Sequence, residues 1–248
     1  MVLNRWDDNE AKKFIDAAGA DLADQELALR VYTSQIIGQD LNLVLHGGGN
    51  TSCKLKRRDI FDNEIDVLHV KGSGWDLGVI EAPGLPGVRL SPLLELRQLN
   101  ALSDEDMVNL QRANLLDSTS PNPSVETLLH AFLPHTYVDH THASAMLSLA
   151  DLPNVEAVVN EIFGGRLVCV PFIMPGFELA KVAAEIYDSN PDVEGLILIN
   201  HGHFAFGDNA KESYDRLIEH TNVVEAWLEK TSGLIPKNAE GHSEKMSS

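Results

Sequence analysis

Cysteine and basic residues are both scarce in this 248-residue chain. Only Cys53 and Cys169 are present, and two thiols in a chain of this length indicate a reduced protein, which we expect to be cytoplasmic. The 19 Lys and Arg residues stand against 37 Asp and Glu, giving a formal net charge of -18. The average surface therefore repels nucleic acid and anionic membranes, so an anionic substrate needs a local site that overrides this field.

Long apolar runs and several common site motifs are also missing. No run approaches the roughly 20 residues that span a membrane, and the N-terminus lacks the apolar stretch of a signal peptide. The chain has no G-x-x-x-x-G-K-[ST] and no H-E-x-x-H, which excludes a P-loop and the common zinc-protease pattern. It has no G-x-G-x-x-G after a strand either, which argues against a nicotinamide site.

The chain does contain the alternating helices and strands of an α/β domain. Apolar stripes predict helices at 21–38, 92–99 and 104–112, from Asn122-Pro123 onward, at 177–187 and from 210 onward. Short apolar runs predict strands at 52–58, 65–70, 136–140, 167–170 and 196–199, with an irregular connection at 80–90. We expect one domain over 1–230, then a polar tail or the start of a linker over 231–248. The hairpin 52–70 implies antiparallel pairing within the sheet.

Two histidines two residues apart, His140 and His142, are the strongest local signal for chemistry. In an extended segment both side chains point the same way, so both imidazoles can reach one metal ion. A third ligand from another strand end would leave one coordination position open, as in a catalytic zinc site. His201 and His203 are the candidates, because both follow the strand 196–199. The chain has 10 histidines, so the pair alone is equally compatible with separate core or surface histidines.

Glu126 stands in the first turn of the helix expected from Asn122-Pro123. An acid in that position complements the helix dipole, which is worth about 0.3–1 kcal/mol. A carboxylate beside a metal ion can instead move a proton at a carbon next to a carbonyl group. The spacing alone favours the simpler interpretation, in which Glu126 stabilises a helix terminus.

Two glycine-rich loops have the chemistry to bind an anion. Gly48-Gly49-Asn50-Thr51-Ser52 offers unhindered backbone N–H groups, an amide and hydroxyls, and Lys71-Gly72-Ser73-Gly74 adds a positive charge. Glycine clusters are more often plain turns, so each loop alone is a weak indication. His130 and His135 are expected to be surface or capping groups, and Cys53 has only Lys54 beside it to activate a thiol.

Taken in order, five short motifs resemble the class II aldolase/adducin family. They are Gly49-Asn50-Thr51-Ser52, Lys71-Gly72-Ser73-Gly74, Ser124-Val125-Glu126, His140-Thr141-His142 and Asn200-His201-Gly202, within a resemblance that covers roughly residues 5–230. The flanking segments 46–49 and 71–77 resemble the aldolase half of bifunctional rhamnulose-1-phosphate aldolase/short-chain dehydrogenase proteins. The resemblance implies a mixed, mainly antiparallel sheet layered by helices on both sides, and a fourfold-symmetric homotetramer with sites between subunits.

The same resemblance implies a role for each matching residue. The ligands of one Zn²⁺ per chain, or of another divalent metal, would be His140, His142 and His201. Glu126 would be the catalytic acid/base. The substrate phosphate would be held by Gly49, Asn50, Ser73, Gly74 and Ser124.

Two positions depart from simpler members of the family. Val125 stands where those enzymes have a second serine, so one phosphate hydroxyl is missing. No tyrosine stands near Ala157, where those enzymes place an assisting acid, which leaves Tyr137, Tyr187 and Tyr214 as candidates to replace it.

The function implied by the resemblance is retro-aldol cleavage of a ketose 1-phosphate, similar to rhamnulose or fuculose phosphate, into dihydroxyacetone phosphate and an aldehyde. A zinc-dependent sugar-phosphate dehydratase or epimerase of the same family is the first alternative, and Glu126 disfavours the epimerase, which usually has aspartate there. A non-catalytic, adducin-like binding module is the second alternative. Such modules lack the metal histidines, whereas this chain keeps all three.

Overall fold

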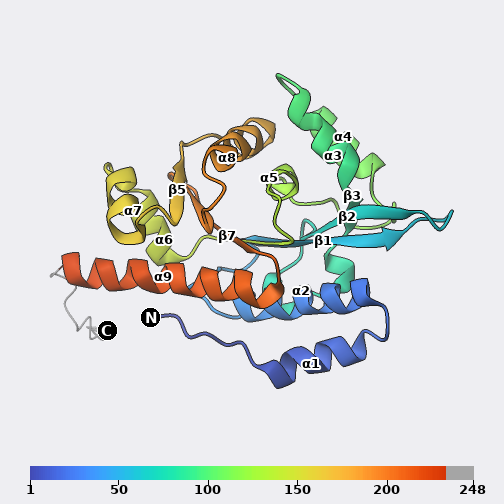
Figure 1. The fold of residues 1–248 in the computed structure, drawn as a ribbon, viewed down its shortest axis with the longest axis horizontal. Helices are drawn as coiled ribbons and strands as arrows, with labels where there is room; N and C mark the ends of the chain where they lie inside the picture. The colour runs from blue at the N-terminus through green and yellow to red at the C-terminus, as the bar shows by residue number, and fades with distance from the viewer. Residues whose placement is uncertain (233–248) are drawn as a thin grey trace, which may run out of the picture.

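The computed structural model describes residues 1–232, which form a seven-stranded sheet between helical layers (Figure 1). The strands are β1 (Asn50–Arg58), β2 (Glu64–Val70), β3 (Gly87–Arg89), β4 (Tyr137–Thr141), β5 (Leu167–Val170), β6 (Gly195–Leu198) and β7 (Gly202–Gly207). Their order across the sheet is β3-β2-β1-β4-β7-β6-β5, and only the β5–β6 pair is parallel. The expected mixed, mainly antiparallel sheet is confirmed.

Helices cover both faces of this sheet. They are α1 (Asp8–Ala17), α2 (Leu22–Gly38), α3 (Leu90–Glu95), α4 (Asp104–Ala113), α5 (Thr127–Phe132), α6 (Ser144–Ala150), α7 (Val155–Phe163), α8 (Phe177–Ser189) and α9 (Ala210–Ser232). Short 3₁₀ turns lie at Leu77–Val79, Ala82–Gly84 and Leu96–Gln98. One apolar core lies under α2, α6, α7 and α9, with α1 outside α2, and a second lies under α3, α4, α5 and α8 (Figure 1). The three-layer arrangement is therefore confirmed.

The period-two alternation of β1 directs its side chains to the two layers. Cys53 and Leu55 belong to the core beneath α2, whereas Ser52 and Lys54 face α5, where they bond to His130. Burial raises the pKa of the Cys53 thiol to about 12, which agrees with the expectation that this cysteine is not activated.

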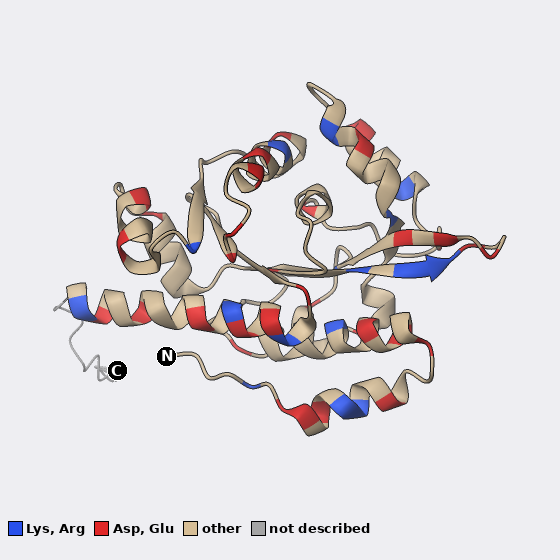
Figure 2. Ribbon diagram, in the orientation of Figure 1, with Lys and Arg blue, Asp and Glu red and all other residues tan. Residues whose placement is uncertain are grey.

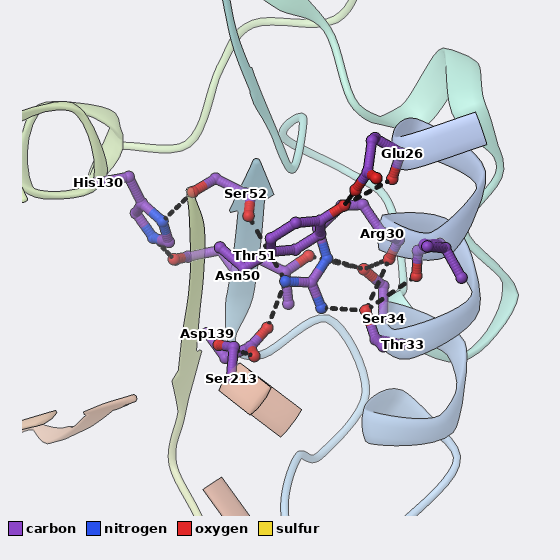
Figure 3. Close-up of polar contacts among 12 residues, drawn as sticks. Glu26, Arg30, Thr33, Ser34, Asn50, Thr51, Ser52, His130, Asp139 and Ser213 are labelled. Carbon is purple, nitrogen blue, oxygen red and sulfur yellow. Dashed lines mark hydrogen bonds and ion pairs between the residues drawn. The ribbon is translucent and has the colours of Figure 1, made fainter. Parts of the chain in front are cut away.

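A buried ion pair ties α2, β1, β4 and α9 together behind the strand that bears the paired histidines (Figure 3). Arg30 on α2 and Asp139 on β4 are both fully buried, with Nη1 2.6 Å from Oδ1. Arg30 also donates to Thr33, and Ser213 on α9 donates to the second oxygen of Asp139 at 2.5 Å. Breaking such a pair would leave a buried charge without its partner, which is costly. Since Asp139 directly precedes His140, the pair holds the backbone at His140 in place.

Three local predictions were wrong. No helix begins at Asn122-Pro123, because the backbone there is paired with the loop 71–74: Ser73 N–H donates to the Asn122 carbonyl and Ser124 N–H to the Lys71 carbonyl. The irregular connection at 80–90 contains β3, which pairs with β2. His130 is not at the surface but completely buried.

The structure describes only the first two residues of the predicted C-terminal tail, 231–248. The expected tail begins at 231, but α9 continues to Ser232. The remainder of that segment lies outside the described residues. No helix within 1–232 is both long and apolar enough to cross a membrane.

Candidate active site

Three histidines from two strand ends converge on one point. His140 lies in β4, His142 is the first residue after β4, and His201 lies in the tight turn between β6 and β7. That turn is closed by Asn200, whose backbone is left-handed with φ 56°. One ring nitrogen from each histidine lies within 4.8 Å of the other two, and the His140 and His142 Nε2 atoms are 2.9 Å apart. These three side chains have the arrangement needed to hold a metal ion.

The hydrogen bonds of His140 set the nitrogen that faces the other two histidines. Its Nδ1 lies 3.1 Å from the His203 carbonyl oxygen, to which it donates, so the lone pair of Nε2 points into the cluster. Phe204 stacks on the ring with centroids 4.2 Å apart. Burial holds the pKa of His140 well below its usual value and lowers those of His142 and His201, so the rings are neutral.

His203, the other candidate for the third ligand, lies outside this cluster. Its Nε2 is 3.1 Å from Nδ1 of His220, in the core beneath α9. Three neutral imidazoles with a free fourth direction are the ligand set of a catalytic divalent metal site, so the residues fit such an ion.

Glu126 lies beside these histidines. Its Oε1 is 3.2 Å from His201 Nε2 and its Oε2 is 3.4 Å from His140 Nε2, with only 6% of the residue exposed. Although Glu126 occupies the N-cap position of α5, its side chain makes no capping hydrogen bond. The carboxylate is therefore not a hydrogen-bonding cap of α5, and it contacts the histidines and Asn50 instead.

The two glycine-rich loops and Glu126 line one cavity of about 460 Å³, together with His142. All five residues expected to hold phosphate line this cavity, namely Gly49, Asn50, Ser73, Gly74 and Ser124. Gly49 has φ 63°, and a Cβ there would lie 2.8 Å from the His140 carbonyl oxygen. Glycine thus lets the loop approach the strand that carries the histidines.

Side chains from α4 complete the cavity wall, although no motif in the sequence indicated them. Gln111 is 2% exposed and its Nε2 has no hydrogen-bond partner among the described residues. Arg112 lines the same cavity and forms no ion pair within residues 1–232. Lys71 is 7% exposed, its Nζ donates to the Gly47 carbonyl oxygen at 3.3 Å, and burial lowers its pKa. Asp and Glu are spread over the helices of both layers (Figure 2), so these cations provide a local positive wall.

None of the four tyrosines of the chain lines this cavity. Tyr137 bonds to Glu26, Tyr187 to His135, and Tyr214 accepts a hydrogen bond from the Arg5 N–H. The fourth tyrosine, Tyr32, accepts from the Asp7 N–H, and none of the four lines the cavity. Val125 does line it, 52% exposed, without a hydroxyl to offer.

Replacing Gly202 with alanine should weaken metal binding by about 10–100-fold, the cost of disturbing groups that orient metal ligands. A Cβ at this position would lie 2.9 Å from ring carbons of both His140 and His142, and 2.8 Å from the Thr141 carbonyl oxygen. Competition with a chromophoric chelator measures the affinity. Gly195→Ala is the control, because its Cβ would meet backbone even more closely, at 2.4 Å from the Phe204 carbonyl oxygen, while none of its three nearest atoms belongs to the three clustered histidines. Equal metal affinity in both variants would contradict this prediction.

Comparisons with known proteins agree with the fold and the motifs. Residues 29–228 match the family model described as Class II Aldolase and Adducin N-terminal domain. The uncharacterized oxidoreductase YuxG of Bacillus subtilis (strain 168) is 36% identical over 228 residues, which is 92% of this chain and 32% of that protein. The chain thus spans about a third of the length of this relative.

Two solved structures are similar to the chain to different degrees. The N-terminal class II aldolase domain of a conserved protein from Thermoplasma acidophilum is 37% identical, with a TM-score of 0.81, covering 92% of this chain and 100% of that one. An L-fuculose 1-phosphate aldolase is 16% identical, with a TM-score of 0.55, covering 93% and 90%, and shows likeness of fold. On the family model and these relatives, the chain belongs to the class II aldolase and adducin N-terminal domain family.

Proposed function

We propose that the protein is a zinc-dependent aldolase that cleaves a ketose 1-phosphate into dihydroxyacetone phosphate and an aldehyde. The observation that carries this proposal is the position of Glu126. Its carboxylate lies 3.2–3.4 Å from two of the three clustered histidines and also lines the cavity formed by the two glycine-rich loops. A carboxylate that could transfer a proton, a histidine cluster that could hold a metal ion and loops that could bind an anion therefore lie together.

The roles of the residues follow from this arrangement. The ion held by His140, His142 and His201 would supply Lewis-acid polarisation of the substrate carbonyl. Glu126 would return a proton to the carbon that loses its bond to the aldehyde fragment, and would remove that proton in the reverse direction. The loops would fix the phosphate at the other end of the substrate, which orients the reacting bond.

Phosphate recognition would combine the loops with the wall from α4. Backbone N–H groups at Gly49 and Gly74 and the hydroxyls of Ser73 and Ser124 would hold the phosphate oxygens. The acidic surface of the protein repels an anionic substrate, and the positive charges of Lys71 and Arg112 would attract its phosphate locally. Family resemblance extends the proposal to a cytoplasmic homotetramer.

Lys71→Met and Arg112→Ala should each raise the KM for a phosphorylated substrate about tenfold or more, because a hydrogen bond to a charged group is worth about 1.5–3 kcal/mol. Steady-state kinetics measures this change, with kcat falling less than kcat/KM. The unphosphorylated ketose is the control substrate, for which neither substitution should matter. A similar loss with both substrates would contradict a role in phosphate binding.

The experiment that tests the function combines metal analysis with product identification. We expect about one zinc per chain, which follows from one three-histidine site, and release of dihydroxyacetone phosphate from ketose 1-phosphates. Loss of water from a sugar phosphate without carbon–carbon cleavage would replace the aldolase with the dehydratase alternative. A protein that binds no divalent metal would refute the mechanism and favour a binding module.

A further inference from the structure

We propose that His130 is a positioning residue that orients the side-chain amide of Asn50, and thereby holds Glu126 with one oxygen free for proton transfer. This inference rests on the proposed function, in which Glu126 moves the proton. His130 lies on α5, one helical turn after Glu126, and is completely buried. Its side chain hydrogen-bonds only Ser52 and Asn50 among the described residues, so it acts on the Glu126 carboxylate through Asn50.

A continuous row of short hydrogen bonds joins Ser52 to Glu126. Ser52 Oγ lies 2.7 Å from Nδ1 of His130, and Nε2 of His130 lies 2.5 Å from Oδ1 of Asn50, as Figure 3 shows. Nδ2 of Asn50 then donates to Oε2 of Glu126 at 2.6 Å. All four residues are buried, and a hydrogen bond in such surroundings is electrostatically stronger than the same bond in water.

The chemistry of each group fixes the direction of the row. Oδ1 of Asn50 can only accept, so Nε2 of His130 carries the proton, and the unprotonated Nδ1 accepts from the Ser52 hydroxyl. Burial holds the pKa of His130 well below its usual value, which keeps the ring neutral with a single N–H. The reversed amide would set Oδ1 of Asn50 against a carboxylate oxygen of Glu126. The tautomer of His130 therefore selects the amide orientation that stabilises the carboxylate.

Both N–H donors of the Asn50 side chain are used by these contacts. One N–H of its amide donates to Glu126, the other to Ser124 Oγ at 3.2 Å, and its carbonyl oxygen accepts from His130. No side-chain donor remains for a phosphate oxygen. Asn50 thus serves Glu126 through its side chain, in contrast to the phosphate role that family resemblance implies for it.

The same contacts distinguish the two oxygens of Glu126. Oε2 is held by Asn50, whereas Oε1 is buried and accepts no hydrogen bond from the described residues. Oε1 faces His201, at 3.2 Å from its Nε2. The oxygen without a donor keeps its basic lone pairs, so Oε1 is the atom that accepts and returns the proton.

Kinetics of two substitutions at His130 test this role. His130→Leu should lower kcat about 10–100-fold with KM for the sugar phosphate unchanged. His130→Gln, whose amide N–H can reach Asn50 Oδ1 from nearly the same place as Nε2, should restore most of the loss. His135→Leu is the matched control and should leave kcat unchanged, because His135 is a half-buried histidine that contacts Tyr187 outside the row. A raised KM with unchanged kcat, or an equal effect of His135→Leu, would overturn the proposal.

A second measurement on the wild-type protein as purified does not depend on turnover or on the folding of a variant. Nitrogen-15 NMR of the histidine-labelled protein should show His130 as the neutral tautomer protonated at Nε2, with its signals assigned by their absence in His130→Gln. Protonation at Nδ1 would overturn the proposal, because Asn50 would then turn its oxygen toward Glu126. If the protein cleaves no ketose phosphate but the Nε2 tautomer is found, the proposed function fails while the positioning of Asn50 stands.

Discussion

Replacing His142 with alanine should abolish metal binding and the proposed activity together. His142 supplies one of three ring nitrogens that lie within 4.8 Å of one another, and the remaining two cannot complete a catalytic site. Loss of a group that merely orients a ligand already costs about 10–100-fold in metal affinity, so loss of the ligand itself should cost more than about 100-fold. Elemental analysis of the dialysed variant, run beside an aldolase assay, measures both losses.

His46→Ala is the control for this substitution. His46 precedes the glycine-rich loop but is 92% exposed and pairs with Asp76, outside the histidine cluster. It should therefore keep both metal and activity. A His142→Ala protein that retained about one metal ion per chain would show that the ion binds elsewhere, since the two remaining histidines are too few for a catalytic site.

Much of the fold was predictable because local signals and tertiary packing agree in most elements. The helix at 21–38 and the hairpin 52–70 match α2 and the β1–β2 pair closely, since apolar stripe, cap and turn residues all indicate the same boundaries. The helix expected from Asn122-Pro123 failed because the favourable capping residues there are used differently. Their backbone pairs with a loop far earlier in the chain, Pro123 with Gly72, and no local sequence pattern indicates such a pairing.

In the candidate site, too, local patterns predicted some residues, whereas the positions of others depend on tertiary packing. Strand alternation predicted that His140 and His142 point together, but spacing could not choose between His201 and His203. The choice depends on the turn at Asn200, because it directs His201 toward the cluster while His203, one position beyond the start of β7, faces α9. Gln111 and Arg112 come from a helix whose sequence shows only ordinary amphipathic character, so their approach to the cavity depends on packing alone. The burial of His130 was not predicted for a related reason. A polar side chain can be buried when it has hydrogen-bond partners, and the partners of His130, Ser52 and Asn50, are far from it in the sequence.

Glu126→Gln should keep the metal and lose turnover. The three histidines are unchanged, and the amide oxygen of glutamine can still accept from Asn50 Nδ2, so the site keeps its shape. Among the described residues, Glu126 is the one carboxylate in the cavity wall, so the substitution removes the carboxylic acid that could carry a proton to and from carbon. General acid–base catalysis contributes about 10²–10⁴-fold, so kcat should fall within that range while KM changes little.

Two comparisons make this prediction specific to proton transfer. Glu178→Gln on α8 removes an exposed carboxylate outside the cavity and should leave kcat unchanged. Exchange of the carbon-bound proton of dihydroxyacetone phosphate with solvent deuterium, followed by NMR, should stop in Glu126→Gln even without the aldehyde partner, because this exchange needs only the base. Continued exchange at the wild-type rate would assign the proton to another group. If Glu126→Gln no longer catalyses the exchange but still binds the metal, the two functions belong to different residues. Glu126 would then transfer the proton, and the three histidines would hold the ion that acts as Lewis acid.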